Sequence, residues 1–136
     1  MIWTLLIAAA LQAAAPPRSF RDLDKGDQSF VDDGRQVVAR TSAEWSTLWR
    51  RHSPDRPQPP VNFTREMVVG VFLGSRATAG FALEVVGVEV AAGELVVRYR
   101  ERRPGRDVIT AQVITSPYHL VAVARHAGEV RFQRVD

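Results

Sequence analysis

Ser116 and His119 come closest in this chain to catalytic machinery, because a serine hydroxyl beside a histidine base is the nucleophile of many hydrolases. Their segment, TSPYH at residues 115–119, lacks the Gly-x-Ser-x-Gly elbow, and Pro117 stiffens the position after the serine. We therefore expect Ser116 and Pro117 to shape the start of a strand. Tyr118 would then bury its ring, and His119 would hydrogen-bond nearby backbone. A small hydrolase using Ser116 and His119 stays open as an alternative, because triads can assemble from distant parts of a chain.

Metal and cofactor sites are not indicated by the remaining residues. The three histidines, His52, His119 and His126, form no His-x-His or His-x-x-x-His pair. The chain has no cysteine, which excludes disulfides, cysteine-based zinc sites and thiol catalysis. We predict no metal, no cofactor and no enzymatic activity.

The segment 74–80, GSRATAG, places two glycines, two hydroxyls and one arginine between two strongly apolar stretches. Loops held by rigid strands are usual places for recognition, and the planar fork of Arg76 suits carboxylates and carbonyls of a protein partner. The spacing is not that of a phosphate-binding or dinucleotide loop. An ordinary turn relaxed by its glycines is an equally open interpretation. The candidate partner-binding residues are Gly74, Ser75, Arg76, Thr78, Gly80, Phe81, Ser116, Tyr118 and His119.

Residues 2–15 carry no charged side chain and end in small residues. Such a run is shorter than the roughly 20 residues of a membrane span and is typical of a secretory signal. We predict a signal peptide over residues 1–15, cleaved near Ala13 or Ala14, and a periplasmic or secreted bacterial protein without stable membrane insertion. A buried hydrophobic N-terminal helix is the alternative. Residues 16–136 then form a single domain, which is large enough to bury a hydrophobic core without disulfides or a structural metal.

The net charge of +3 comes from 18 basic and 15 acidic residues that are mixed along the chain. The densest basic cluster has five arginines within residues 98–106, interrupted by Glu101. A nucleic-acid binder would combine a continuous basic stripe with stacking aromatics or a known motif, and neither is present. We interpret the cluster as the solvated face of an edge strand and predict no nucleic-acid partner.

A helix is predicted to begin at the capping box TSAE, residues 41–44, and to end before Pro54. The spacing i, i+3, i+4, i+7 then gives it one apolar face, made of Trp45, Leu48, Trp49 and His52. We expect the two tryptophans to pin the helix across a sheet, and a ligand platform is the alternative.

The rest of the chain has the composition and periodicity of strands. Strands are predicted near Phe30 and over residues 35–40, 66–73, 81–90, 94–102, 107–114, 118–125 and 130–135. Helices and strands do not alternate, which argues against a parallel α/β sheet. The predicted fold class is α+β, mainly β: a curled antiparallel sheet of six or seven strands with one N-terminal covering helix. We expect the domain to be a monomer on its own.

Four stretches follow one another along the chain: EWSTLW, FTREMVVGVFLGSRATAGFALEVVGV, LVVRYRE and TSPYHLVAV. Together they resemble the PrcB C-terminal domain family, most strongly over residues 45–125. The family's namesake is an accessory subunit of a bacterial surface protease complex. The resemblance implies an exported, non-catalytic domain that binds or stabilises a partner protein. The family pattern Thr-Gly-Gly-Tyr is changed here to Thr-Ala-Gly-Phe at residues 78–81, and the namesake's lipoprotein cysteine is absent.

A second resemblance belongs to a different functional class. The Thr-x-Gly-Phe sequence at residues 78–81 is similar to the wedge loop with which chagasin-like inhibitors enter the cleft of cysteine proteases. The other loops of that family have no counterpart in this chain. The predicted function is therefore an exported accessory domain that binds or stabilises another exported protein. The family's namesake implies a protease as the class of partner, and a chagasin-like inhibitor is the alternative.

Overall fold

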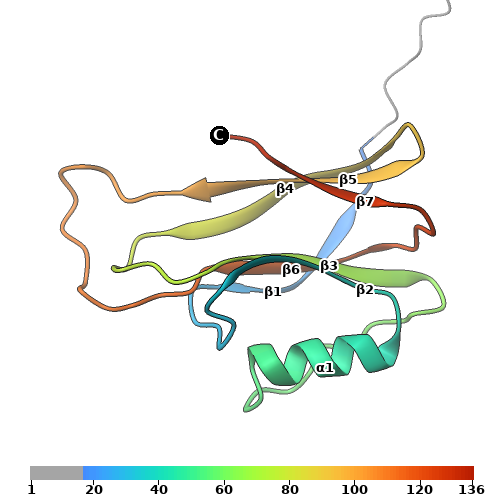
Figure 1. Ribbon diagram of the computed structural model, residues 1–136, viewed down its shortest axis with the longest axis horizontal. Helices are drawn as coiled ribbons and strands as arrows, with labels where there is room; N and C mark the ends of the chain where they lie inside the picture. Colours follow the sequence, from blue (N-terminus) through green and yellow to red (C-terminus); the bar gives the residue numbers. More distant parts are fainter. Residues whose placement is uncertain (1–16) are drawn as a thin grey trace, which may run out of the picture.

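The computed structural model describes residues 17–136 as two β-sheets and one helix stacked in three layers (Figure 1). One sheet has four strands in the order β1-β6-β3-β2, and the other has three in the order β4-β5-β7. The elements are β1 (Phe20–Gly26), β2 (Gly34–Ala39), α1 (Ser42–His52), β3 (Glu66–Leu73), β4 (Ala82–Ala91), β5 (Glu94–Arg102), β6 (Tyr118–Ala124) and β7 (Val130–Arg134). The predicted mainly β fold, with six or seven strands and one covering helix, is confirmed, and the number of strands is seven.

Helix α1 begins at the predicted capping residue, since the Thr41 hydroxyl accepts a hydrogen bond from the Glu44 amide at 3.2 Å. The helix covers the outer face of the four-stranded sheet (Figure 1). Trp45 and Trp49 are only 1% and 3% exposed, so both are core anchors, as predicted. Their indole N–H groups donate to the carbonyls of Pro59 and Arg56, which fixes the proline-rich connector after the helix.

Strand β3 contributes to two hydrophobic cores, one on each face of its sheet, because its apolar side chains alternate between the two faces. Val68 and Phe72 face α1, whereas Met67 and Val69 face the three-stranded sheet. Strand β6, next to β3, alternates in the same way. A strand buried on both faces needs apolar residues throughout, which is why residues 66–73 could be predicted from composition alone.

The arrangement of the strands differs from the prediction in three respects. The strands form two sheets instead of one curled sheet, because the connections after β3, β5 and β6 each lead from one sheet to the other. The β5–β7 pair is parallel, while the other pairs are antiparallel. The predicted strand at 107–114 is irregular, and the predicted short strand near Phe30 is replaced by β1.

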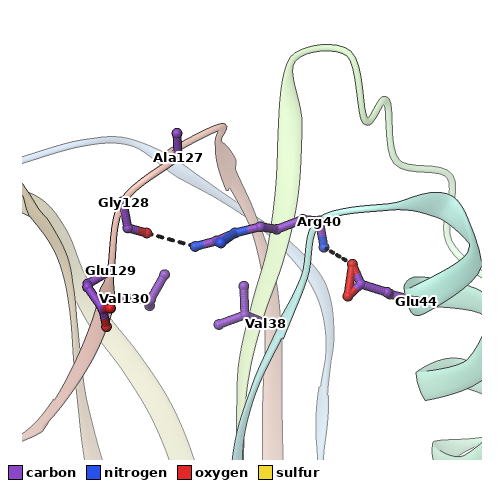
Figure 2. A pocket seen from close by; sticks show the side chains of 7 residues that line it. All are labelled: Val38, Arg40, Glu44, Ala127, Gly128, Glu129 and Val130. Atoms are coloured by element: carbon purple, nitrogen blue, oxygen red, sulfur yellow. Dashed lines mark hydrogen bonds between the residues drawn. The ribbon is translucent and has the colours of Figure 1, made fainter.

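Arg40, which follows β2, ties the two sheets together at one side (Figure 2). Its Nη2 donates to the Gly128 carbonyl at 2.8 Å, and its amide donates to Glu44 at 3.3 Å. The Arg40 Nε is buried without a hydrogen-bond partner among the described residues. A hollow of about 490 Å³ lies around this contact, with the acidic Glu44 and Glu129 in its wall. We therefore interpret Arg40 as a structural tie.

No helix within residues 17–136 has the length and apolar character needed to cross a bilayer. The predicted signal peptide, residues 1–15, lies outside the described residues. Its cleavage and the export of the domain stay predictions.

Candidate partner-binding site

Two loops lie side by side at one end of the molecule, where both cross between the sheets (Figure 1). We call them the paired loops: residues 74–81 between β3 and β4, and residues 103–117 between β5 and β6. The amide of Arg76 donates to the Thr115 carbonyl at 2.7 Å, and the reverse bond measures 3.0 Å. The Ala79 amide donates to the Ala111 carbonyl at 3.0 Å, and the Thr115 hydroxyl donates to Thr78. The structure thus brings together the two segments that the sequence singled out.

Both glycines of the first loop are required by its backbone. Gly74 and Gly80 have φ of +80° and +95°, a region that other residues rarely adopt. At Gly80, a Cβ atom would lie 2.9 Å from the Pro104 Cβ and 3.0 Å from the Thr110 methyl. The glycine therefore also permits the close approach of the second loop. Gly74 and Gly80 are therefore needed for the turn itself. This role does not conflict with a place in the candidate partner-binding site.

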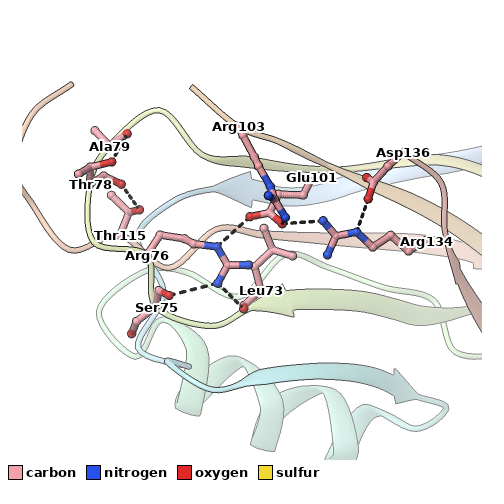
Figure 3. A network of polar contacts seen from close by, with 10 residues as sticks. All are labelled: Leu73, Ser75, Arg76, Thr78, Ala79, Glu101, Arg103, Thr115, Arg134 and Asp136. Carbon is pink, nitrogen blue, oxygen red and sulfur yellow. Dashed lines mark hydrogen bonds and ion pairs between the residues drawn. The ribbon is translucent and has the colours of Figure 1, made fainter. Parts of the chain in front are cut away.

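Arg76 points into the domain and braces the first loop (Figure 3). Its Nε donates to Glu101 at 2.8 Å, and its Nη1 donates to the carbonyls of Leu73 and Ser75 at 3.1 Å. Its guanidinium also lies over the Phe81 ring, 5.9 Å from the centroid. These contacts use the Arg76 Nε and Nη1 donors, which we expected to hydrogen-bond a partner protein. Arg76 accordingly holds the loop in shape, with 26% of its side chain exposed.

Glu101 is the anchor of this network, since its side chain is 1% exposed. It accepts from Arg76 and also from Arg134 at 2.8 Å. Burial alone would raise the pKa of Glu101, but the hydrogen bonds from the two arginines outweigh it and keep the pKa below its usual value. The carboxylate therefore stays charged and holds loop 74–81 on strand β5.

The other candidate residues divide between surface and core. Ser75 is exposed, and its amide donates to the Asp32 carbonyl at 3.1 Å. Ser116, Tyr118 and His119 are 8%, 3% and 2% exposed. Tyr118 packs in the core against α1, and His119 bonds to Val85 and Asp22, so these three residues do not form an exposed surface.

The surface of the second loop carries large apolar side chains that the sequence analysis did not single out. Residues 108–114, which we call the apolar loop, contribute four of the six large hydrophobic side chains that are exposed within residues 17–136. Their exposed fractions run from 50% to 99%, and the residues are Val108, Ile109, Val113 and Ile114. Small soluble domains seldom gather such residues at one place unless the place binds something.

A third loop, residues 27–33, adjoins the paired loops. Its Asp27 and Asp32 carbonyls accept from the amides of Ser116 and Ser75. Phe30 in this loop is 70% exposed. Within residues 17–136, the end that holds the paired loops therefore carries five of the six exposed large hydrophobic side chains.

Ser116 and His119 do not meet as a nucleophile and base. The His119 Nδ1 accepts from the Val85 amide at 2.8 Å, and the ring pairs through Nε2 with Asp22 at 2.7 Å. Both ring nitrogens are thus occupied, and no hydrogen bond joins Ser116 to His119 in the described structure. His119 bonds to backbone, as predicted, although that backbone belongs to β4 and not to its own neighbourhood.

Ser29, His52 and Asp24 form a hydrogen-bonded chain that has the residue types of a catalytic triad. The His52 Nδ1 lies 2.7 Å from the Ser29 hydroxyl, and its Nε2 lies 2.8 Å from Asp24. His52 is fully buried, however, and the Ser29 oxygen already accepts from the Val31 amide. We interpret this chain as a structural link between α1 and β1.

The two buried histidines make stability dependent on pH. Burial lowers the pKa of His52 and His119 below the usual 6.5, and their bonds to Asp24 and Asp22 do not offset it. The unfolded chain therefore takes up these protons at higher pH than the folded domain. We expect the free energy of unfolding to fall below about pH 6.5, by up to about 1.4 kcal/mol per pH unit for each histidine.

Urea denaturation at pH 7.5 and 5.5 measures this effect. A His119→Asn variant keeps an acceptor for the Val85 amide but does not titrate, so its pH dependence should be smaller. Equal unfolding free energies of the wild type at the two pH values would contradict the assignment.

Comparison of the chain with models of known protein families finds one match. Residues 67–124 match the family model described as PrcB C-terminal, which confirms the resemblance inferred from the sequence. The match runs from β3 to the end of β6 and contains both paired loops, but it does not extend back to α1. No curated protein and no solved structure matches the chain. Within residues 17–136, no group of three or more potential ligand side chains could hold a metal ion.

Proposed function

We propose that this chain is an exported, non-catalytic accessory domain that binds a partner protein through the paired loops. The observation that carries the proposal is the concentration of exposed apolar side chains on the apolar loop, residues 108–114. The apolar loop is joined to loop 74–81 by the bond from the Ala79 amide to the Ala111 carbonyl, and loop 74–81 is itself braced by the buried Arg76–Glu101 pair. A rigid support under an apolar surface is the arrangement that protein-binding sites favour, because less entropy is lost on binding.

The family match supports an accessory role in a protease complex. It covers the paired loops and their supporting strands, so the proposed surface belongs to the part of the chain that the family shares. We propose that the partner is an exported protein and that a protease is the first class to test. The domain would be monomeric before it meets this partner.

Export is part of this proposal and rests on the uncharged residues 2–15. N-terminal sequencing of the protein from its native host should find a start at Ala14 or Ala15, as cleavage after Ala13 or Ala14 gives. A cytosolic protein that retains Met1 would contradict export.

Affinity purification from the native cell envelope tests the binding surface. We expect a wild-type bait to recover a specific exported protein, and an Ile109→Ser, Ile114→Ser double variant to recover at least about tenfold less. A Val86→Ser bait is the matched control, because Val86 is 39% exposed but lies on β4, outside the paired loops. Full recovery by the double variant would place the site elsewhere.

The same purified domain should be assayed against papain-like proteases. The accessory role predicts no inhibition. In the free domain, the Thr78 carbonyl and the Phe81 ring of loop 78–81 contact Thr115 and Arg76. Stoichiometric inhibition that is lost with Phe81→Ala would favour the chagasin-like alternative.

A further inference from the structure

The apolar loop has the sequence of an interior strand but belongs to neither sheet. Residues 108–114 read VITAQVI, rich in the β-branched residues that strands favour. Val108 and Ile114 alternate with Ile109 and Val113, so an extended backbone would carry large apolar side chains on both faces. Such two-sided apolar patterning is typical of a strand covered on both faces. In the structure, the loop instead passes beyond the ends of both sheets (Figure 1).

The backbone of this segment is also largely unpaired. None of the six amides of residues 109–114 donates a hydrogen bond within the described structure. Among the contacts of residues 17–136, the only backbone carbonyl of the apolar loop that accepts a hydrogen bond is that of Ala111, from the Ala79 amide. A row of free amides next to exposed apolar side chains is what an exposed edge strand presents to another chain.

The charges beside the segment favour one kind of partner. Arg102 and Arg103, at the end of β5, pair with Glu84 and Glu101, but their side chains stay 63% and 69% exposed. These two carboxylates also pair with Arg100, Arg76 and Arg134, so positive charge remains in excess beside the segment. Arg106 adds a third positive charge, and Asp107 is the nearest acid in sequence. Complementarity therefore selects a partner whose edge strand is flanked by acidic side chains.

We propose that residues 108–114 are added as a strand to an exposed, acid-flanked sheet edge of the partner, a mode of recognition that rests on the partner binding proposed above. In this mode the main-chain hydrogen bonds supply affinity, and the alternating side chains supply specificity. Val108 and Ile114 pack on one face of the extended partner sheet, and Ile109 and Val113 pack on the other. The braced backbone at Thr115 and Ala79 limits how far the segment moves to reach the edge.

Hydrogen–deuterium exchange on the complex captured from the native envelope tests this directly. Alternate amides within residues 109–114 should exchange at least about tenfold more slowly in the complex than in the free domain. A Gln112→Pro bait removes one amide and stops strand pairing while leaving the four apolar side chains in place. It should recover at least about tenfold less partner than the matched Gln112→Ala bait.

The outcomes separate strand addition from partner binding in general. Loss of the partner with Ile109→Ser but full retention with Gln112→Pro and unchanged exchange would overturn strand addition and leave the binding surface intact. Failure of the wild type to recover any partner would overturn both. Protection of residues 109–114 that appears in the purified domain alone and rises with its concentration would assign the segment to a second copy of this chain, which contradicts the proposal. Unfolding curves of the Gln112→Pro variant should match the wild type, since the Gln112 amide has no partner in the fold.

Discussion

Replacing Trp45 with alanine should lower the free energy of unfolding by about 3–5 kcal/mol, as for other buried large aromatics. Trp45 is 1% exposed, lies 5.5 Å from Trp49 between ring centroids, and donates its indole N–H to the Pro59 carbonyl. The substitution would leave a cavity between α1 and the four-stranded sheet and free the connector that follows the helix. Urea denaturation followed by circular dichroism measures the change.

Phe30→Ala is the matched control, because this aromatic side chain is 70% exposed. It should change the unfolding free energy by less than about 0.5 kcal/mol. A loss below about 1 kcal/mol for Trp45→Ala would mean that the helix face is not a core surface. The ligand platform considered for the two tryptophans would then need to be tested.

Replacing Glu101 with alanine should cost about 2–4 kcal/mol, because it leaves Arg76 and Arg134 without their shared carboxylate. The expected loss is below that of a fully buried ion pair, since both arginines are partly exposed. Loop 74–81 should also loosen, because the Glu101 carboxylate is what joins Arg76 to β5. The other hydrogen bonds of the Arg76 side chain go to the carbonyls of Leu73 and Ser75, next to it in sequence. Amide exchange of residues 75–80 should accelerate accordingly.

Asp136→Ala provides the control for Glu101→Ala. Asp136 also pairs with Arg134, but its side chain is 54% exposed, so its removal should cost less than about 0.5 kcal/mol. Equal, small losses for the two variants would show that Glu101 does not anchor the network. The loop would then be held by its backbone bonds to Asp32, Ala111 and Thr115.

The helix and the strands whose positions depend on neighbouring residues alone were predicted correctly from the sequence. The capping hydroxyl of Thr41, the stop before Pro54 and the apolar spacing of the tryptophans gave the position of α1. Residues 66–73 and 94–102 were predicted with the bounds that the structure has. A two-sided apolar run and a glycine turn require no knowledge of the rest of the chain.

Strand pairing depends on distant residues and could not be predicted in the same way. Strand β1, FRDLDKG, is mostly polar and is a strand because β6 accepts it at the sheet edge. Residues 107–114 have the opposite property, since they favour strand structure but find no partner in the fold. Intrinsic β-propensity is weak compared with tertiary pairing, which explains both errors.

The candidate site could be predicted only in part, because contacts between residues far apart in the sequence leave no local signal. The sequence singled out segments 74–81 and 115–119, and the structure places loops 74–81 and 103–117 side by side. The Arg76–Glu101 pair spans 25 residues and has no local signal, so Arg76 was predicted to face a partner. The apolar loop was missed because its exposure becomes visible only once its strand assignment fails.

Site-specific photocrosslinking in the native host tests the central claim most directly. A photoreactive amino acid at position 109, where the side chain is 99% exposed, should crosslink to one exported protein. The same amino acid at position 47, on the exposed side of α1, is the control and should not crosslink to that protein. Partner binding through the paired loops predicts the crosslink at 109 alone, and equal crosslinking at both positions or none at 109 would contradict it.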